Sequence, residues 1–258
     1  MSLHIKGLRG ARSPVRPEEA VVAGDFHFGD HDPKMVKLFI YFCKTTQPKH
    51  IFLNGDILDC YSLSKYHKTP LKIHQLQEEI ELWEEFIKAL RVACPNSHIY
   101  FMDGNHDVRL KLYAEKQPEI TKLRAFSTEV LLNLREYNVS YKPYKEFDVY
   151  GDLHIWHGDI ASKHSASAYL DRWGVSGIFN HKHNIQFMAK TDLTRTIKVW
   201  INGCMCSLNP HYKLAGPANW QQGFCHIKKV GDKCYVNLIH VEDYRFLFDS
   251  QIYSLRQE

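Results

Sequence analysis

The chain has 258 residues, of which 44% are hydrophobic and 24% are charged, and these ordinary globular proportions exclude wholesale disorder. Its formal net charge of +4 is only mildly basic and does not by itself indicate a nucleic-acid-binding protein. The sequence has no apolar run of membrane-spanning length, so we expect no membrane partner.

The beginning of the chain is basic and contains prolines. Lys6, Arg9 and Arg12 interrupt any apolar signal-peptide core. We therefore expect residues 1–19 to form a basic N-terminal arm that is at least partly disordered. Residues 20–258 are expected to form a single domain.

The first half of this domain alternates predicted strands and predicted helices. Each strand is indicated by a short apolar run that ends beside a glycine and a polar residue. The longest helix is indicated by apolar residues in steps of three and four, from Ile73 to Leu90. Its single apolar face favours packing against the core over a cap above a cleft. The expected elements are strands at 20–24, 51–53 and 98–102, and helices at 33–45, 71–92 and, for the most part, 108–136.

From about residue 139 the pattern becomes rich in strands. A helix is expected at 162–173, and the last two strands should form a hairpin whose turn, 230–233, contains glycine and aspartate. The two halves together predict helix-covered layers on a mixed or double sheet. The expected strands are 140–144, 147–149, 153–156, 197–201, 223–228 and 234–241.

The seven cysteines are odd in number and lack the spacing of a disulfide framework, which argues against a secreted scaffold. Cys204 and Cys206 alternate along an expected strand, and this spacing is poor for a zinc finger. We expect seven free thiols and a cytoplasmic protein.

Five short polar segments carry side chains that suit metal chemistry. Residues i and i+2 of a strand or irregular loop point the same way, so an Asp-x-His or His-x-His pair can reach one centre. Carboxylates, an amide and imidazoles together suit first-row transition metals better than magnesium or calcium alone. Ligands bind at the carboxyl ends of strands in such folds, where the first three segments lie. The segments are Asp25-Phe-His27, Gly55-Asp56, Gly104-Asn105-His106-Asp107, His157-Gly-Asp159 and His181-Lys-His183.

Each segment alone is also typical of a turn, a helix cap or a surface loop. Their joint occurrence, in order along the chain, favours a metal site over these structural alternatives. In that order they resemble the signature of the calcineurin-like metallophosphoesterases, over about residues 20 to 210. The matching motifs are Gly24-Asp25-Phe26-His27, Gly55-Asp56-Ile57-Leu58-Asp59, Gly104-Asn105-His106-Asp107, His157-Gly158-Asp159 and Asn180-His181-Lys182-His183.

The resemblance implies an α/β fold of α+β character, a two-sheet mixed β-sandwich flanked by helices of the metallo-dependent phosphatase type. It also implies a role for each motif residue. Asp56 would bridge two metals, and His106 would meet the phosphate or leaving group, oriented by Asp107 or a nearby carboxylate. The implied ligands are Asp25, His27 and His183 for one metal, and Asn105, His157 and His181 for the other.

One position departs from the family pattern. The family usually has glycine before the final His-x-His, whereas this chain has Asn180. Asparagine is the non-glycine residue that best tolerates a positive φ, so we expect Asn180 to adopt that conformation.

The expected cofactors are two divalent or trivalent metal ions. Manganese is the ion we expect to support activity in an assay, and the ligand set also admits iron, zinc, nickel or cobalt. Two ions roughly 3.5–4 Å apart can clamp one phosphoryl group and supply a bridging hydroxide as the nucleophile. His106 would then act on the leaving oxygen, a general-acid role worth roughly 10²–10⁴-fold in rate.

Three substrate hypotheses stay open: a phosphodiesterase acting on nucleic acid or nucleotides, a phosphomonoesterase acting on a small molecule or phosphoprotein, and a non-catalytic metal-binding scaffold. The first is favoured by basic residues near the motifs and by an aromatic and basic segment at 61–68, which also fits an ordinary solvated loop. Trp220 and the other late tryptophans are expected to pack in the core or at its rim. The candidate substrate contacts are Tyr61, Arg109, Lys163 and His164, with Arg124 and Arg172 nearby in the sequence.

Overall fold

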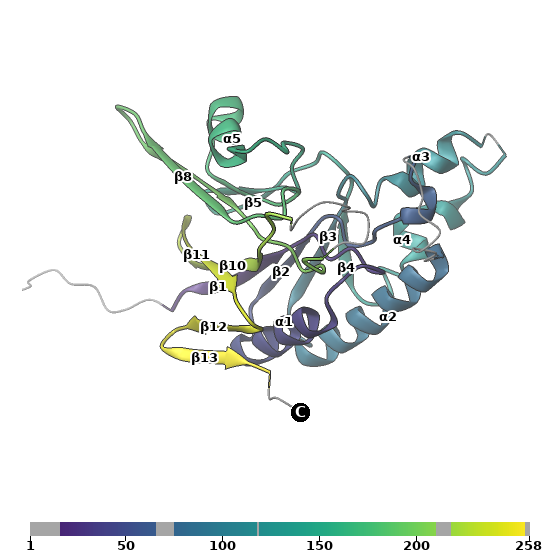
Figure 1. Ribbon diagram of the computed structural model, residues 1–258, viewed down its shortest axis with the longest axis horizontal. Coiled ribbons are helices and arrows are strands. Elements are labelled where there is room, and N and C mark those ends of the chain that lie inside the picture. Colours follow the sequence, from purple (N-terminus) through teal and green to yellow (C-terminus); the bar gives the residue numbers. More distant parts are fainter. Residues whose placement is uncertain (1–15, 66–74, 118, 210–217, 256–258) are drawn as a thin grey trace, which may run out of the picture.

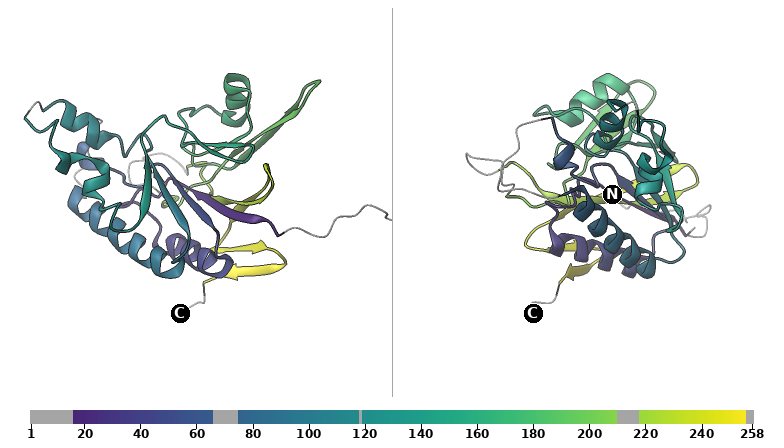
Figure 2. Two further views of the ribbon diagram at one scale, coloured as in Figure 1. Left: turned by 180° about the vertical axis from the view of Figure 1, so that it is seen from behind. Right: turned by 90° about the vertical axis from the view of Figure 1, so that its right-hand side faces the viewer.

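The computed structural model describes residues 16–65, 75–117, 119–209 and 218–255. Two β-sheets face each other, with helices on the outer face of each (Figure 1). Figure 2 shows the same layers from two other sides. The prediction of a two-sheet mixed sandwich flanked by helices is therefore confirmed.

The first sheet has the strand order β11-β10-β1-β2-β3-β4. Its strands β1 to β4 are parallel, whereas β10 is antiparallel to β1 and pairs with β11 across the predicted hairpin. The strands are β1 (Glu18–Ala23), β2 (His50–Asn54), β3 (His98–Met102), β4 (Val139–Lys142), β10 (Gln222–Val230) and β11 (Lys233–Val241).

The second sheet has the order β5-β6-β7-β9-β8. Strands β8 and β9 extend beyond the body of the molecule as a long hairpin (Figure 1). A separate two-stranded sheet consists of β12 (Arg245–Phe248) and β13 (Gln251–Ser254). The strands of the second sheet are β5 (Asp148–Tyr150), β6 (Leu153–Ile155), β7 (Gly177–Phe179), β8 (Gln186–Thr191) and β9 (Thr196–Ile201).

Helices α1 and α2 cover the first sheet, and α5 covers the second (Figures 1 and 2). Helix α2 packs its apolar face into the core through Trp83 and Leu90, as predicted. The helices are α1 (Pro33–Thr46), α2 (Leu76–Ala93), α3 (Arg109–Glu115), α4 (Thr128–Leu131) and α5 (Ser165–Trp173), with short 3-10 turns η1 (Tyr61–Leu63) and η2 (Arg124–Phe126).

Strand β1 shows how one strand supplies two cores. Its side chains alternate between the two faces of the sheet because the strand period is two residues. Ala20 and Val22 lie in the core between the sheets, whereas Val21 and Ala23 lie in the core beneath α1 and α2. Both faces are therefore apolar, and β1 reads as a continuous apolar run in the sequence.

Several predicted boundaries were wrong. The predicted arm included residues 16–19, but β1 already begins at Glu18, and residues 1–15 lie outside the described chain. Helix α2 begins at Leu76, where Gln75 and Glu78 form a capping box; the predicted residues 71–74 lie outside the described chain. The helical region predicted at 108–136 is divided into α3, η2 and α4.

All seven cysteines are free thiols, as predicted, and the structure shows that all seven are buried. Cys204 and Cys206 follow β9 and form isolated backbone bridges, so the prediction that they belong to a strand was wrong. Within the described residues, no helix combines the length and the apolar character that crossing a membrane requires.

Candidate metal centre

The five predicted segments meet at one edge of the two facing sheets. Asp25 and His27 follow β1, and Asp56 follows β2. The segment of Asn105 follows β3, that of His157 follows β6, and that of His181 follows β7. Five loops that are far apart in the sequence thus bring their polar side chains to a common place.

The loop backbones are strained in the same way. Asp25, His27, Asp56, His181 and His183 all have a positive φ, between 49° and 74°. This left-handed conformation is uncommon for residues other than glycine and clusters at functional sites. The first loops hold each other, because the amide of Asp25 donates to the Gly55 carbonyl and that of His27 donates to the Asp56 carbonyl, both at 2.9 Å.

Two glycines allow the loops to approach closely. A Cβ atom at Gly55 would lie 2.5 Å from the His157 ring, and its φ is +81°. A Cβ atom at Gly104 would lie 2.1 Å from Asp56 Oδ1. Any larger residue at either position would displace a candidate metal ligand.

Asp25, His27 and His183 form the first group of candidate ligands. His183 Nε2 lies 3.2 Å from Asp25 Oδ1 and 3.2 Å from His27 Nε2. All three residues are buried. Their donor atoms lie within 4.8 Å of one another, which is compatible with a shared ion.

Asn105, His157 and His181 form the second group. Asn105 Oδ1 lies 2.6 Å from His181 Nδ1 and 3.2 Å from His157 Nε2. Asp56 lies between the groups, because its Oδ2 is 3.2 Å from His157 Nε2 and 3.8 Å from His27 Nε2. The carboxylate therefore occupies the position that a bridging ligand would need.

The side-chain charges of the two groups are strongly coupled. Burial alone would raise the pKa of Asp25, but His183 and His157 outweigh it and lower this pKa to about 2. Burial alone would lower the pKa values of both histidines, but Asp56 raises that of His157 to about 10 and Asp25 raises that of His183 to about 9. Burial, with repulsion by His157, lowers the pKa of His181 to about 4. Two imidazolium cations thus neutralise the buried carboxylates at neutral pH.

The burial and chemical type of the donor atoms also fit a bound metal ion. Among the described side chains, buried Asp25 Oδ1 has an ion-pair contact with His183 Nε2 at 3.2 Å but no well-aligned hydrogen bond. A buried carboxylate oxygen without a well-aligned donor is costly unless a cation compensates it. Carboxylate, amide and imidazole donors gathered around this oxygen match the preferences of first-row transition metals.

Asn180 does not adopt the expected positive φ, and that prediction was wrong. The left-handed residues of this loop are the histidines that follow it, His181 and His183. Asn180 is fully buried, and its Nδ2 donates to Asp25 Oδ2 at 3.1 Å. Its side chain therefore holds a candidate metal ligand, a role that a glycine cannot supply.

Two further asparagines hold Asn180 in place. Asn180 Oδ1 accepts hydrogen bonds from Asn54 Nδ2 at 2.8 Å and from Asn202 Nδ2 at 3.2 Å. A Cβ atom at Gly24 would lie 2.8 Å from the Asn180 side chain. This buried amide cluster was missed in the sequence, because isolated asparagines carry no recognisable spacing.

His106 lies beside the two groups and is held from both sides. Asp59 Oδ1 lies 2.8 Å from His106 Nδ1, and Arg109 Nη2 lies 3.0 Å from His106 Nε2. Because a guanidinium only donates, Nε2 accepts and Nδ1 carries the proton that Asp59 receives. Asp59 Oδ1 also lies 3.2 Å from His27 Nδ1, so one carboxylate orients two rings. Burial alone would raise the pKa of Asp59, but the imidazoles of His106 and His27 hold this pKa well below its usual range.

Asp107 does not contact the His106 ring. Its carboxylate accepts backbone hydrogen bonds from Leu58 and Gly104, both at 2.8 Å, and from Ile57 at 3.1 Å. Burial and the nearby Asp56 raise the pKa of Asp107 to about 6. The carboxylate that orients His106 is thus Asp59, which occupies the last position of the Gly-Asp-x-x-Asp motif and received no role from the sequence.

Only some of the predicted substrate contacts have described contacts that connect them to the candidate metal centre. Arg109 reaches the centre through His106. Tyr61 is half-buried in η1, where its backbone amide donates to Glu79 at 3.3 Å. Lys163 lines a cavity of about 240 Å³, whereas His164 is exposed just before α5 and no described contact joins it to the centre.

This cavity lies against the candidate metal centre. Trp220 forms one of its walls, and the Trp220 ring meets the His183 ring edge-on with their centroids 4.3 Å apart. Trp220 was expected to pack in the core or at its rim, so its place beside the centre was missed. The cavity is lined by Lys163, Lys182, Asn184, Asn219 and Trp220.

The chain was compared with models of protein families and with known proteins, and a family model matches most of it. The profile described as "Calcineurin-like phosphoesterase" matches residues 20–226, which is more than half of the chain. The Gene 54 protein of Mycobacterium phage D29 is 26% identical over 253 residues, covering 91% of this chain and 98% of the relative. The Gene 54 protein of Mycobacterium phage L5 is 25% identical over 251 residues, with the same coverage of 91% and 98%.

Solved structures that are similar to the chain include Vps29 and a purple acid phosphatase. Vps29 from Chaetomium thermophilum has a TM-score of 0.47 and 13% identity, covering 87% of this chain and 92% of the other. Purple acid phosphatase PPD1 from yellow lupin (Lupinus luteus) seeds has a TM-score of 0.45 and 12% identity, covering 92% of this chain and 52% of the other.

Proposed function

We propose that this chain, which belongs to the calcineurin-like phosphoesterase family, is a metal-dependent hydrolase of phosphate esters. The observation that carries this proposal is the position of Asp56. Its Oδ2 lies within 3.8 Å of donor nitrogens from both candidate ligand groups, His27 and His157. One carboxylate shared by two groups is the arrangement that a dinuclear centre requires.

In this proposal the two ligand groups hold two metal ions. Asp25, His27 and His183 would hold one, and Asn105, His157 and His181 the other, with Asp56 shared. When bound, the two ions supply Lewis-acid stabilisation of phosphoryl charge and lower the pKa of a water that attacks phosphorus. The ligand set admits manganese, iron, zinc, nickel or cobalt, and we propose manganese for assays.

The neighbouring side chains have distinct proposed tasks. Asp59 keeps the proton of His106 on Nδ1, which turns Nε2 towards the reacting group. Arg109 donates to Nε2 and brings a permanent positive charge to the side where a phosphate would lie. Once the guanidinium shifts onto the phosphate, His106 can take up a proton from solvent on Nε2, and the resulting imidazolium stabilises or protonates the leaving oxygen. Asp107 is a positioning residue that holds the loops of Asp56 and Asn105 together through backbone amides.

We further propose that the ester is a diester, in nucleic acid or a nucleotide. A diester has a second substituent that needs a surface beside the metals. The cavity next to His183 offers this surface, with an aromatic ring in Trp220 and the cations Lys163 and Lys182. Bases stack on aromatic side chains, and lysines bind the adjoining phosphates. Lys182 Nζ donates to the Ala161 carbonyl at 2.8 Å, which holds this side chain at the cavity wall.

The experiment compares substrates with manganese added, and then with iron, zinc, nickel or cobalt in its place: a chromogenic diester, a chromogenic monoester, and single- and double-stranded DNA. The proposal predicts hydrolysis of the diester and of single-stranded DNA. Turnover of the monoester alone would support a phosphomonoesterase. An absence of turnover with every metal would favour a non-catalytic scaffold.

A variant tests the cavity separately. Lys163→Ala should raise KM for single-stranded DNA several-fold more than KM for the small chromogenic diester, because one phosphate contact is lost. Lys190→Ala is the matched control, since Lys190 is an exposed lysine that pairs with Asp171 on α5. Equal effects of the two variants on DNA hydrolysis would exclude the cavity as the DNA-binding surface.

The buried free thiols support a reducing compartment, for which we propose the cytoplasm.

A further inference from the structure

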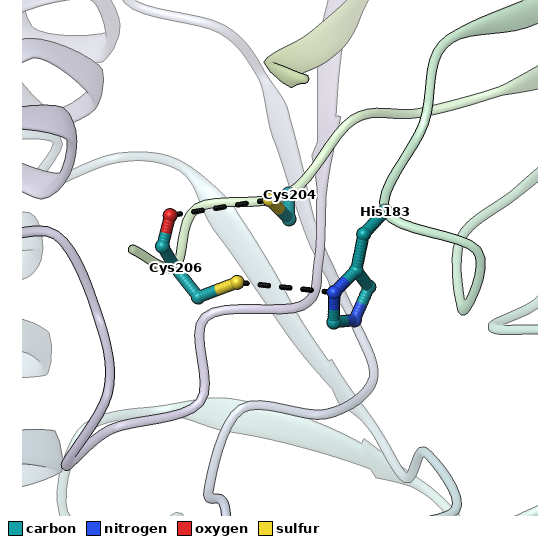
Figure 3. A group of neighbouring side chains, drawn as sticks. All are labelled: His183, Cys204 and Cys206. Carbon is teal, nitrogen blue, oxygen red and sulfur yellow. Dashed lines mark hydrogen bonds between the residues drawn. The ribbon is translucent and has the colours of Figure 1, made fainter. Parts of the chain in front are cut away.

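Two cysteines that the proposed hydrolysis does not use form a cluster with His183, which is one of the candidate metal ligands. Cys204 and Cys206 lie in the loop after β9, and His183 lies in the loop after β7. Figure 3 shows the two thiols on the same side of the histidine ring. The exposed fractions of the three residues are 0%, 2% and 8%, so the cluster is buried.

The ligand atoms of this cluster converge. Cys206 Sγ lies 3.9 Å from His183 Nδ1, and Cys204 Sγ lies 3.9 Å from the Cys206 carbonyl oxygen (Figure 3). The two sulfurs and a ring nitrogen all lie within 4.8 Å of one another. In a tetrahedral zinc site, bond lengths of about 2.3 Å to sulfur and 2.0 Å to nitrogen bring neighbouring ligand atoms to roughly 3.5–3.8 Å. The observed cluster therefore needs a contraction of about 1 Å or less.

The loop that carries the thiols is held in place from several sides. Cys204 forms a backbone bridge with Gln222, and Cys206 forms one with His31. Between them, the amide of Met205 donates to the Asp25 carbonyl at 3.0 Å. These contacts arrange both sulfurs before any ligand binds, which lowers the ordering cost of a binding site.

His183 belongs to two clusters through its two ring nitrogens. Its Nε2 faces Asp25 and His27, whereas its Nδ1 faces Cys206. The first cluster offers oxygen and nitrogen ligands, and the second offers sulfur and nitrogen. Thiolates select soft cations such as zinc, whereas carboxylates suit harder ions such as manganese.

We propose that Cys204, Cys206 and His183 Nδ1 form a separate binding site for a thiophilic divalent cation, zinc above all. Each thiol gives up its proton to solvent when the cation binds, and Nδ1 binds as the unprotonated nitrogen. Three protein ligands leave a fourth position for water or a backbone oxygen, as in other sites with two cysteines and one histidine. With both sites filled, His183 would have released both ring protons to solvent and would link the two ions as an imidazolate.

The test is made on reduced full-length protein loaded with zinc and freed of excess metal. X-ray absorption at the zinc edge should show sulfur at about 2.3 Å, because the candidate metal centre offers no sulfur ligand. Cobalt loading should give a thiolate-to-metal charge-transfer absorption. Both signatures should disappear in the double variant Cys204→Ser/Cys206→Ser, which should also retain about one equivalent less zinc.

The matched control is Cys94→Ser/Cys234→Ser, which removes two buried thiols that lie in different hydrophobic clusters. This control should keep the sulfur signal and the full zinc content. If the double variant of the loop does not fold, Cys206→Ser alone is used, and the sulfur signal should then be halved or lost. A wild-type protein without zinc–sulfur scattering would overturn the proposal, and Cys206 would then be only a hydrogen-bond partner of His183. A sulfur signal that persists unchanged in the loop variants would overturn it as well.

Discussion

Asn180 Nδ2 donates a hydrogen bond to Asp25 Oδ2 at 3.1 Å, and this leaves Oδ1 of the same carboxylate facing His27 and His183. Oδ1 itself accepts no well-aligned hydrogen bond within the described chain, although it is buried. The Asn180 amide, together with the His181 backbone N–H that donates to Oδ2 at 3.0 Å, thus fixes which carboxylate oxygen is presented to a cation. A partner that orients a ligand in this way contributes to metal affinity without touching the metal.

Replacing Asn180 by glycine, the usual family residue, should weaken metal binding at the Asp25 group. The loss of a partner that orients a ligand typically costs roughly 10–100-fold in affinity. Calorimetric titration with manganese should show this loss. Asn138→Gly is the matched control, because Asn138 has a φ of 51° that glycine adopts freely and lies outside the candidate centre. Equal manganese affinities for Asn180→Gly and the wild type would show that the amide does not position Asp25.

His106→Ala should retain the metals and lose most of the rate. The imidazole contacts Asp59 and Arg109 but is not one of the proposed ligands, and its role on the leaving group is worth roughly 10²–10⁴-fold. Diester hydrolysis and metal content are measured on the same samples. His240→Ala, at an exposed histidine of β11, is the control. Loss of a metal ion from His106→Ala would mean that His106 is itself a ligand.

Metal binding should release protons. The raised pKa values of His157 and His183, about 10 and about 9, mean that both rings are protonated at pH 7 without metal. A metal needs the unprotonated nitrogen, so filling both groups should release about two protons. Calorimetry in buffers of different ionisation enthalpy counts them, and apparent affinity should rise with pH up to about 9 to 10. An affinity independent of pH between 6 and 8 would contradict the assignment of these histidines as ligands.

The same shifts predict how the metal-free protein responds to pH. A histidine whose folded pKa is raised stabilises the fold fully below its unfolded pKa of 6.5, and this stabilisation is lost as pH rises through the folded value. The melting temperature of the metal-free protein should therefore fall as pH increases from about 7 to 10. Metal-loaded protein should show a smaller decrease, because the ions replace the protons.

Glu18 should give a stability change at acid pH. Hydrogen bonds from Lys49 and Lys229 lower its pKa from 4.5 to about 2. A depressed folded pKa stabilises the fold above pH 4.5, and the effect is lost as pH falls towards 2. Glu18→Gln should lower the melting temperature by no more than a few degrees at pH 7, since exposed ion pairs contribute little.

This difference between Glu18→Gln and the wild type should shrink as the pH falls below 4.5, which thermal unfolding followed by circular dichroism can measure. Glu146→Gln, at an exposed glutamate, is the control. A difference in melting temperature that stays constant from pH 7 to pH 3 would mean that the ion pairs of Glu18 do not stabilise the start of β1.

The strands that carry the candidate centre were predictable because they are buried on both faces. β1, β2 and β3 are continuous apolar runs, and each ends at a glycine or aspartate that turns the chain. β8 was not predicted, since nearly all of its residues are exposed and show no alternation. The hairpin of β12 and β13 turns at Asp249 and Ser250, which both have a positive φ, instead of at the asparagine or glycine that usually marks such a turn.

The ligand types and their order were visible in the motifs, but the partners that orient them were not. Asn54 ends β2, whereas Asn180 and Asn202 lie in loops after β7 and β9, and no local spacing indicates a contact between residues 126 positions apart. The positive φ expected at Asn180 instead falls on the histidines that follow it. Cys206 faces His183 for the same long-range reason, because β7 and β9 are neighbours in the sheet.

The central claim is that Asp56 joins two metal ions into one hydrolytic centre, and one comparison tests it most directly. Manganese content and diester hydrolysis are measured together on the wild type, on Asp56→Asn, and on Asp152→Asn as a control at an aspartate that pairs with Lys233 far along the chain. The account predicts about two manganese ions per chain and turnover in the wild type and the control. It predicts that Asp56→Asn loses manganese and that its hydrolysis rate falls by more than about 100-fold. This loss is larger than the one expected for replacing a residue that only orients a metal ligand. Wild-type turnover by Asp56→Asn would contradict the dinuclear centre.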